Sequence, residues 1–152
     1  MNREIICIDL KSFYASVECV ERDLDPFKTN LVVADSTRGS GTVCLAVSPK
    51  MKMLGVKNRC RIFEIPQNIR YIKAKPRMSK YIEYSANIYS IYLKYVSKDD
   101  IHGYSIVEPI LDVTECLKIY KMNSLQLAKK IITEIYNTYK ITATAGVGTN
   151  MY

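Results

Sequence analysis

The sequence predicts a mixed α+β chain in which a smaller lobe is inserted after the first strand of a sheet-and-helix unit. Residues 4–8 form a short apolar run that ends at Asp9, which is typical of a strand buried on both faces. Residues 79–97 and residues 124–139 each carry an apolar stripe at helical spacing. With residues 13–76 set aside, the order is strand, helix, strand, strand, helix, strand, the ferredoxin-like βαββαβ arrangement.

The first part of the chain alternates predicted helix and strand. A helix is expected over residues 12–21, with Ser12 able to act as its N-cap, and the Asp-Pro pair at 25–26 should end it. Two short apolar runs, at 31–34 and 42–47, are expected to be strands. The segment between them is rich in glycine and serine and is expected to be a turn or loop.

Residues 50–80 are strongly basic, with ten lysines and arginines and one acid, Glu64. Such a run is often only a solvated face, but its length and the net charge of +7 favour a surface that faces phosphate. Two pieces within it, at 61–65 and 71–74, are strand-like.

The second half of the chain supplies the rest of the larger unit. The stripe on the helix over 79–97 contains several tyrosines, which we interpret as core residues and not as a platform for stacking bases. Strands are expected at 104–107 and 110–113, separated by Glu108 and a proline. The helix over 124–139 can be capped by Asn123 or Ser124. The chain closes on a strand at 141–147. The stripe expected to face the core comprises Tyr81, Ser85, Ile88, Ile91, Tyr92 and Tyr95 on the first helix and Leu127, Ala128, Ile131, Ile132 and Ile135 on the second.

Five scattered cysteines and one histidine, His102, form no CxxC pair or Cys/His cluster. A disulfide framework or a zinc site is therefore not expected, and a reducing, cytoplasmic location fits best. No segment approaches the roughly 18 apolar residues that a membrane span needs, and the N-terminal apolar run is too short for a signal peptide.

Two acids should meet at one end of the predicted sheet. In a βαββαβ sheet the first and third strands are central neighbours, so Asp9 can lie beside the hairpin that carries Glu108. An acid that ends a strand is weak evidence alone, but a pair of carboxylates suits Mg²⁺, which keeps other positions for water and phosphates.

Two motifs extend this interpretation. Residues 8–18 read IDLKSFYASVE and resemble the opening DxxxFYASVE motif of Y-family translesion DNA polymerases, and residues 104–114 read YSIVEPILDVT and are similar to the YSIDExFLDVT hairpin of that family. Segments 55–57, 76–79 and 141–150 also resemble the family, in its UmuC-like impB/mucB/samB UV-repair branch. Nucleotide cyclases share the βαββαβ topology, but the Gly-Gly-Asp/Glu-Glu-Phe type of turn that they need is absent.

The resemblance implies a discontinuous palm at 1–12 and 77–152 and a fingers lobe at 13–76. It also implies that Asp9 and Glu108 are catalytic and, with the backbone carbonyl of Leu10, bind Mg²⁺. Val107 departs from the family, which has an aspartate there that bridges two metal ions. Since valine offers no oxygen, metal binding is expected to be weak.

The same resemblance assigns the nucleotide contacts. Phe13 and Tyr14 are expected at the deoxynucleotide, with Tyr14 as the steric gate under the sugar; a core aromatic is the alternative reading of Tyr14. Lys52 is expected to face the triphosphate, while Pro49 stands where the family has a tyrosine contact.

The implied function is metal-dependent nucleotidyl transfer from a deoxynucleoside triphosphate to a DNA primer-template, in translesion synthesis and DNA repair within the SOS response. The family continues into a thumb and a little finger after the point where this sequence ends, so the chain alone is expected to be inactive. The alternative is a non-catalytic remnant that binds nucleic acid or protein.

Overall fold

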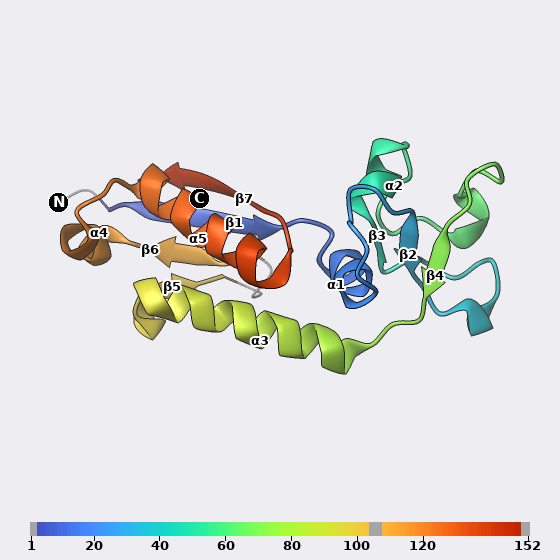
Figure 1. The fold of residues 1–152 in the computed structure, drawn as a ribbon, viewed down its shortest axis with the longest axis horizontal. Coiled ribbons are helices and arrows are strands. Elements are labelled where there is room, and N and C mark those ends of the chain that lie inside the picture. Colours follow the sequence, from blue (N-terminus) through green and yellow to red (C-terminus); the bar gives the residue numbers. More distant parts are fainter. Residues whose placement is uncertain (1–2, 104–107, 150–152) are drawn as a thin grey trace. The chain divides into compact units, whose positions relative to one another are not determined.

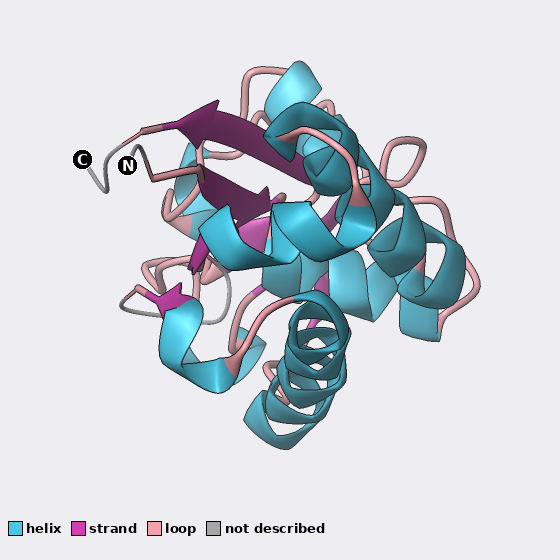
Figure 2. Ribbon diagram, turned by 90° about the vertical axis from the view of Figure 1, so that its left-hand side faces the viewer, coloured by secondary structure: helices cyan, strands magenta, loops and turns pink. Residues whose placement is uncertain are grey.

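A computed structural model describes residues 3–103 and 108–149. The chain divides into two compact units: the sheet unit, Met1–Lys11 with Ile82–Tyr152, and the inserted unit, Ser12–Tyr81. Helices and strands are both well represented, which confirms the predicted α+β class (Figure 2).

The sheet unit is built on four antiparallel strands in the order β5-β6-β1-β7 (Figure 1). This order places β1 beside β6 at the centre, as the βαββαβ prediction requires. Ile5, Ile6, Ile8 and Leu10 of β1 are all buried, and β6, β7 and α5 contact this strand. The strands are β1 Ile5–Leu10, β5 Ile101–His102, β6 Ile110–Asp112 and β7 Ala143–Gly148.

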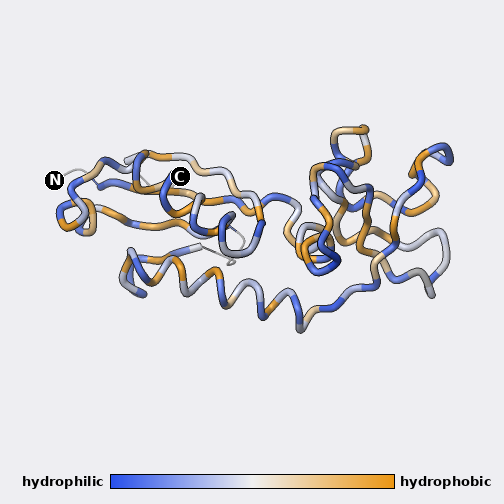
Figure 3. The backbone as a smooth tube through the Cα atoms, viewed as in Figure 1, coloured by the Kyte–Doolittle hydropathy of each residue, from blue (hydrophilic) through white to orange (hydrophobic). Residues whose placement is uncertain are grey.

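Three helices complete the sheet unit: α3 Met78–Tyr95, which begins in the inserted unit, α4 Thr114–Tyr120 and α5 Ser124–Tyr139. The hydrophobic and hydrophilic residues of α3 alternate along the helix (Figure 3). Helix α5 begins at an Asn123 cap, whose side chain accepts the Gln126 N–H at 2.8 Å while Gln126 accepts the Asn123 N–H at 3.0 Å. Its buried stripe packs on β7 and β1.

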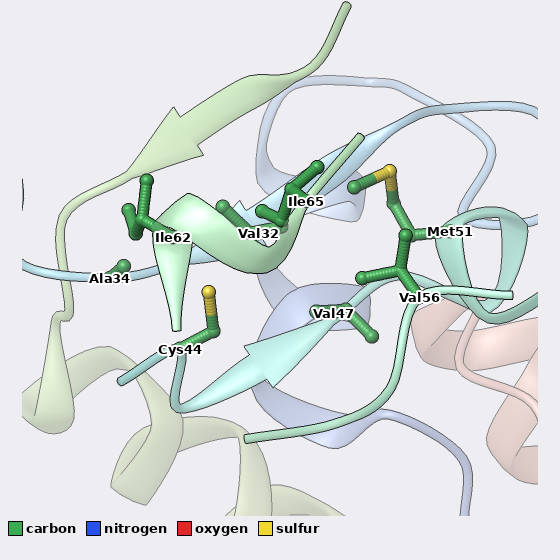
Figure 4. Close-up of a cluster of buried hydrophobic side chains, with 8 residues drawn as sticks. All are labelled: Val32, Ala34, Cys44, Val47, Met51, Val56, Ile62 and Ile65. Atoms are coloured by element: carbon green, nitrogen blue, oxygen red, sulfur yellow. The ribbon is translucent and has the colours of Figure 1, made fainter. Parts of the chain in front are cut away.

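The inserted unit contains a small three-stranded sheet in the order β3-β2-β4, with β2 and β4 parallel. Ser48 caps α2 by accepting the Met51 N–H at 3.2 Å, and Pro49 occupies the first helical turn, where its missing N–H is harmless. The elements are α1 Phe13–Glu21, β2 Leu31–Val33, β3 Ala46–Val47, α2 Pro49–Met53 and β4 Ile72–Ala74. Its core is a cluster of buried side chains from β2, β3, α2 and the loops (Figure 4).

Several local predictions need correction. Residues 61–65 are not a strand but include the 3-10 turn Ile62–Glu64, because the Glu64 side chain accepts the Arg61 N–H at 2.9 Å and Pro66 follows. The strand expected over 42–47 shortens to β3. Ser12 occupies the N-cap position of α1 with a left-handed backbone, φ 46°, and its side chain makes no capping hydrogen bond.

The region before Glu108 also differs from expectation. The strand predicted over 104–107 lies outside the described residues, and the neighbour of β6 is the earlier strand β5. Helix α4 was not predicted. Two further 3-10 turns, Ser36–Arg38 and Lys98–Asp100, complete the described elements. None of the helices within the described ranges is long and apolar enough to cross a membrane.

Candidate active site

Asp9 and Glu108 line one pocket of about 510 Å³ in the sheet unit. Asp9 stands near the end of β1, opposite Thr144 of β7. Glu108 lies in the segment that leads into β6, and this segment is held to β1 because the Ile8 N–H donates to the Pro109 carbonyl at 3.1 Å. The full lining is Cys7, Ile8, Asp9, Glu108, Pro109, Ile110, Thr144 and Gly146.

Gly103 supports the backbone at Glu108, a role that the sequence motifs did not reveal. Its φ of +121° is unfavourable for any residue with a side chain, and a Cβ there would lie 3.0 Å from the Glu108 carbonyl oxygen. A glycine is therefore required for this close approach. The only sequence signal was the glycine itself, which directly follows β5 Ile101–His102.

A lysine that no sequence motif marks already pairs with Asp9. The Lys11 ammonium lies 2.9 Å from Asp9 Oδ2, and both side chains are a little under half exposed, at 42% and 46%. A salt bridge at such exposure contributes little stability. It nevertheless places a positive charge where a divalent cation would bind, so the two compete for the carboxylate.

The donor set decides how well metal ions would fit. Across residues 3–103 and 108–149, no three His, Cys, Asp or Glu side chains gather in a metal-binding arrangement. The pocket offers the carboxylates of Asp9 and Glu108, and the backbone of Leu10 follows Asp9 at the end of β1. Val107 lies outside the described residues, and its side chain contains no oxygen. These donors suit one loosely held Mg²⁺ and do not fit a two-ion centre.

The residues expected at the nucleotide lie in the inserted unit. Phe13 is buried, while Tyr14 is partly exposed and stacks on Tyr81 with ring centroids 4.5 Å apart and an interplanar angle of 14°. Lys52 is exposed on α2. Tyr14 is therefore an aromatic residue that reaches the surface with one face covered by Tyr81.

Glu18 is the centre of a buried ionic cluster that the sequence motifs also missed. Its side chain is fully buried and accepts hydrogen bonds from Arg22 at 2.6 Å, from Arg77 at 2.6 and 3.1 Å, and from the Tyr81 hydroxyl at 2.6 Å. Tyr81 is the residue that stacks on Tyr14. The cluster therefore ties α1 to the start of α3 and fixes the ring beside Tyr14.

Two opposing effects set the pKa of Glu18. Burial alone would raise this pKa, but the hydrogen bonds from Arg77, Tyr81 and Arg22 outweigh burial and hold it below the ordinary value of 4.5. Burial, and then the bond to Glu18, raise the pKa of Tyr81 well above its usual range. At neutral pH the cluster thus holds an ionised carboxylate and a protonated phenol.

Replacing Glu18 with Ala should destabilise the chain by about 3–5 kcal/mol, because it leaves Arg77 and Tyr81 without their acceptor in a buried site. Urea unfolding followed by circular dichroism measures this change. Glu21→Ala on the same helix is the matched control, since Glu21 pairs with Lys80 at 3.4 Å across a more exposed site, and we expect a change of about 1 kcal/mol or less there.

The same cluster should make stability depend on pH. A carboxyl whose pKa is lower in the folded chain stabilises it above the unfolded pKa, and this contribution is lost as pH falls through the folded pKa. The free energy of unfolding should therefore fall on acidification below about pH 4.5 in the unsubstituted chain, and less steeply in Glu18→Gln. Equal acid profiles for the two chains would contradict the assignment.

Comparisons of sequence and of structure with known proteins agree on one family. The model of the impB/mucB/samB family matches residues 8–152. UvrX of Bacillus subtilis (strain 168) is 35% identical over 99% of this chain, and DNA polymerase IV 2 of the same organism is 33% identical over 98%. The chain spans about a third of the length of these two relatives, 35% in each case. A solved insertion ternary complex of Dbh DNA polymerase superposes on 97% of this chain and 43% of its own, with a TM-score of 0.82 and 30% identity.

Proposed function

Since the chain belongs to the impB/mucB/samB family of Y-family DNA polymerases, we propose that it forms the palm and fingers of a translesion DNA polymerase and binds a primer-template and a deoxynucleoside triphosphate. The sheet unit corresponds to the palm and the inserted unit to the fingers. The observation that carries this proposal is the meeting of Asp9 and Glu108, 99 positions apart in the sequence, in one pocket of the sheet unit.

Each candidate residue has a role in this proposal that its chemistry supports. Asp9, the Leu10 carbonyl and Glu108 would hold Mg²⁺, and dependence on a divalent metal is general to Y-family polymerases. A bound ion neutralises charge on the transferring phosphate. Phe13 and Tyr14 would bound the sugar, and the exposed Lys52 would attract the triphosphate.

Val107 limits what the chain can do with this site. Without a bridging carboxylate, and with Lys11 paired to Asp9, the site holds metal weakly. We therefore propose that nucleotidyl transfer by this chain is slow or absent while DNA binding is kept. A non-catalytic nucleic-acid-binding module is the second candidate function, and Val107 together with the basic surface of the inserted unit favours it.

Primer extension separates the two functions. At a chain concentration that saturates the primer-template, which compensates for weak DNA binding, the Val107→Asp chain should extend a labelled primer with Mn²⁺ and deoxynucleoside triphosphates, and the unsubstituted chain should remain close to the background. Asp9→Asn in the Val107→Asp chain is the control that should return extension to background. If the Val107→Asp chain binds DNA but never extends the primer, the non-catalytic function is the better account.

The basic surface should bind DNA with a steep dependence on salt. Eight of the ten basic residues in 50–80 are exposed, and two of them, Lys73 and Lys75, lie on or directly after β4. Each neutralised phosphate contributes about −0.9 to the slope of log affinity against log salt, and affinity should be about 10⁻⁴–10⁻⁶ M, as for non-specific binding. Fluorescence anisotropy of a labelled duplex at several salt concentrations measures both.

A matched pair of variants tests where the DNA binds. The Lys73→Gln/Lys75→Gln chain should bind more weakly and lose up to about 1.8 from the magnitude of the slope. The Lys118→Gln/Lys121→Gln chain removes the same charge from exposed positions of the sheet unit and should retain the slope. Equal losses in both variants would show that net charge, and not the basic surface, governs binding.

A further inference from the structure

Two of the five cysteines stand opposite each other in the inserted unit. The Cys44 N–H donates to the Cys60 carbonyl at 2.8 Å, next to the antiparallel bridge between Val43 and Arg61. Partners in an antiparallel ladder have Cα atoms about 4.5–5.5 Å apart. A separation of this size between Cys44 and Cys60 would fall within the range of about 4.4–6.8 Å over which a disulfide can form.

Their side chains also share one environment. Cys44 is fully buried in the core cluster of the inserted unit (Figure 4). Cys60 is half-buried and packs against the same cluster. Burial, and then the Cys60 thiol beside it, raise the pKa of Cys44 to about 12. Cys44 is therefore a protonated, inaccessible thiol in direct contact with a more accessible one.

The other cysteines lack such a partner among the described residues. Cys19 and Cys116 are buried, the first in the inserted unit and the second in the sheet unit, and Cys7 is exposed at the Asp9 pocket. All five cysteines are free thiols. The pairing of a reachable and a buried thiol is thus specific to positions 44 and 60.

We propose that Cys44 and Cys60 form an oxidation site that closes to an intramolecular disulfide when the chain meets a peroxide. The Cys60 sulfur, as thiolate, attacks one peroxide oxygen and breaks the O–O bond, which gives a sulfenic acid and hydroxide. The Cys44 sulfur then displaces the sulfenic oxygen as water, and the S–S bond forms. In balance, two thiols and one hydrogen peroxide give one disulfide and two water molecules.

The crosslink would covalently close the segment that contains α2. It closes residues 44–60, which include all of α2 and its exposed Lys52. A crosslink of this kind restricts the unfolded chain and so favours the folded one. We therefore expect oxidation to raise the thermal midpoint of the chain, and a thiol reductant to reverse the change.

Thiol counting and mass spectrometry after treatment with dilute hydrogen peroxide test the proposal. The oxidised chain should lose two of its five titratable thiols and two hydrogen atoms in mass, and its digest should contain a reducible peptide that joins Cys44 to Cys60. Cys60→Ser should lose the crosslink completely. Cys7→Ser, the matched control at another exposed thiol, should still lose two thiols.

Three outcomes would overturn the proposal. The first is that the thiols of Cys44 and Cys60 stay titratable at peroxide concentrations that oxidise Cys7. The second is that Cys60 accumulates sulfinic acid while Cys44 stays free. The third is that the crosslink joins two copies of the chain. Because Cys60 is only half-buried, Cys60→Ser should keep the thermal midpoint of the reduced chain, and this measurement separates lost pairing from lost folding.

Discussion

The Val107→Asp chain should bind Mn²⁺ with a deoxynucleoside triphosphate about tenfold or more tightly than the unsubstituted chain. The substitution adds a negative charge and two oxygen ligands directly before Glu108 in the sequence. It also removes a branched apolar group that cannot accept a metal's hydration shell. A tenfold gain in affinity corresponds to about 1.4 kcal/mol of binding free energy, which one added carboxylate can supply to a divalent ion. Isothermal titration calorimetry measures the affinity of each chain.

The fold should be stable with either valine or aspartate at position 107. The sequence predicts a strand over 104–107, and valine is favoured in strands, so we expect the loss caused by Val107 to fall on metal binding and not on stability. Val107→Asn is the matched control, since it adds one oxygen without charge and should recover only a small part of the gain. Tight binding of two ions by the unsubstituted chain would contradict the role assigned to Val107.

Tyr14→Ala should remove the preference for deoxynucleotides over ribonucleotides. In the structure one face of the Tyr14 ring lies against Tyr81. The hydroxyl of Tyr81 donates a hydrogen bond to Glu18. If Tyr14 is the steric gate, a ring held in this way would not turn aside for a 2′-hydroxyl, and it would exclude ribose by overlap. In the Val107→Asp chain with primer-template and Mn²⁺, we expect the ratio of ribo- to deoxynucleotide dissociation constants to fall about tenfold or more, or about 1.4 kcal/mol.

Two variants distinguish exclusion from packing. Tyr14→Phe keeps the ring and should keep the preference. Tyr81→Phe keeps the stack but removes the hydroxyl that donates a hydrogen bond to Glu18. It should reduce stability and change the preference for deoxynucleotides less than Tyr14→Ala does. An unchanged ratio in Tyr14→Ala would show that Tyr14 is a core aromatic with no part in sugar selection.

The sequence carried enough information to predict the sheet and the approach of two acids. The apolar run of β1 and the amphipathic stripes of α3 and α5 set the order of elements, and that order makes β1 and β6 neighbours. The proximity of Asp9 and Glu108 follows from this topology, because both residues lie at the same end of the sheet. Their convergence therefore depends on pattern and not on contacts between side chains.

What escaped prediction depends on contacts between distant residues. Glu18 and Arg22 are four residues apart, which is the spacing of an ordinary exposed helix pair. Neither the burial of Glu18 nor its bonds to Arg77 and Tyr81, 59 and 63 residues later, follows from that spacing. The strand expected over 61–65 failed for a local reason. Ile62 and Ile65 have the spacing of one helical turn, and the Glu64 side chain completes that turn by binding the Arg61 N–H.

The central claim is that Asp9, Glu108 and position 107 belong to one metal and nucleotide site, and a double-mutant cycle by calorimetry tests it most directly. Affinity for Mn²⁺ with a deoxynucleoside triphosphate would be measured in four chains: unsubstituted, Val107→Asp, Asp9→Asn, and Val107→Asp with Asp9→Asn. If the residues share a site, the gain from Val107→Asp disappears when Asp9 is neutralised, which gives a coupling free energy of about 1 kcal/mol or more. A gain of equal size in both backgrounds would contradict the claim.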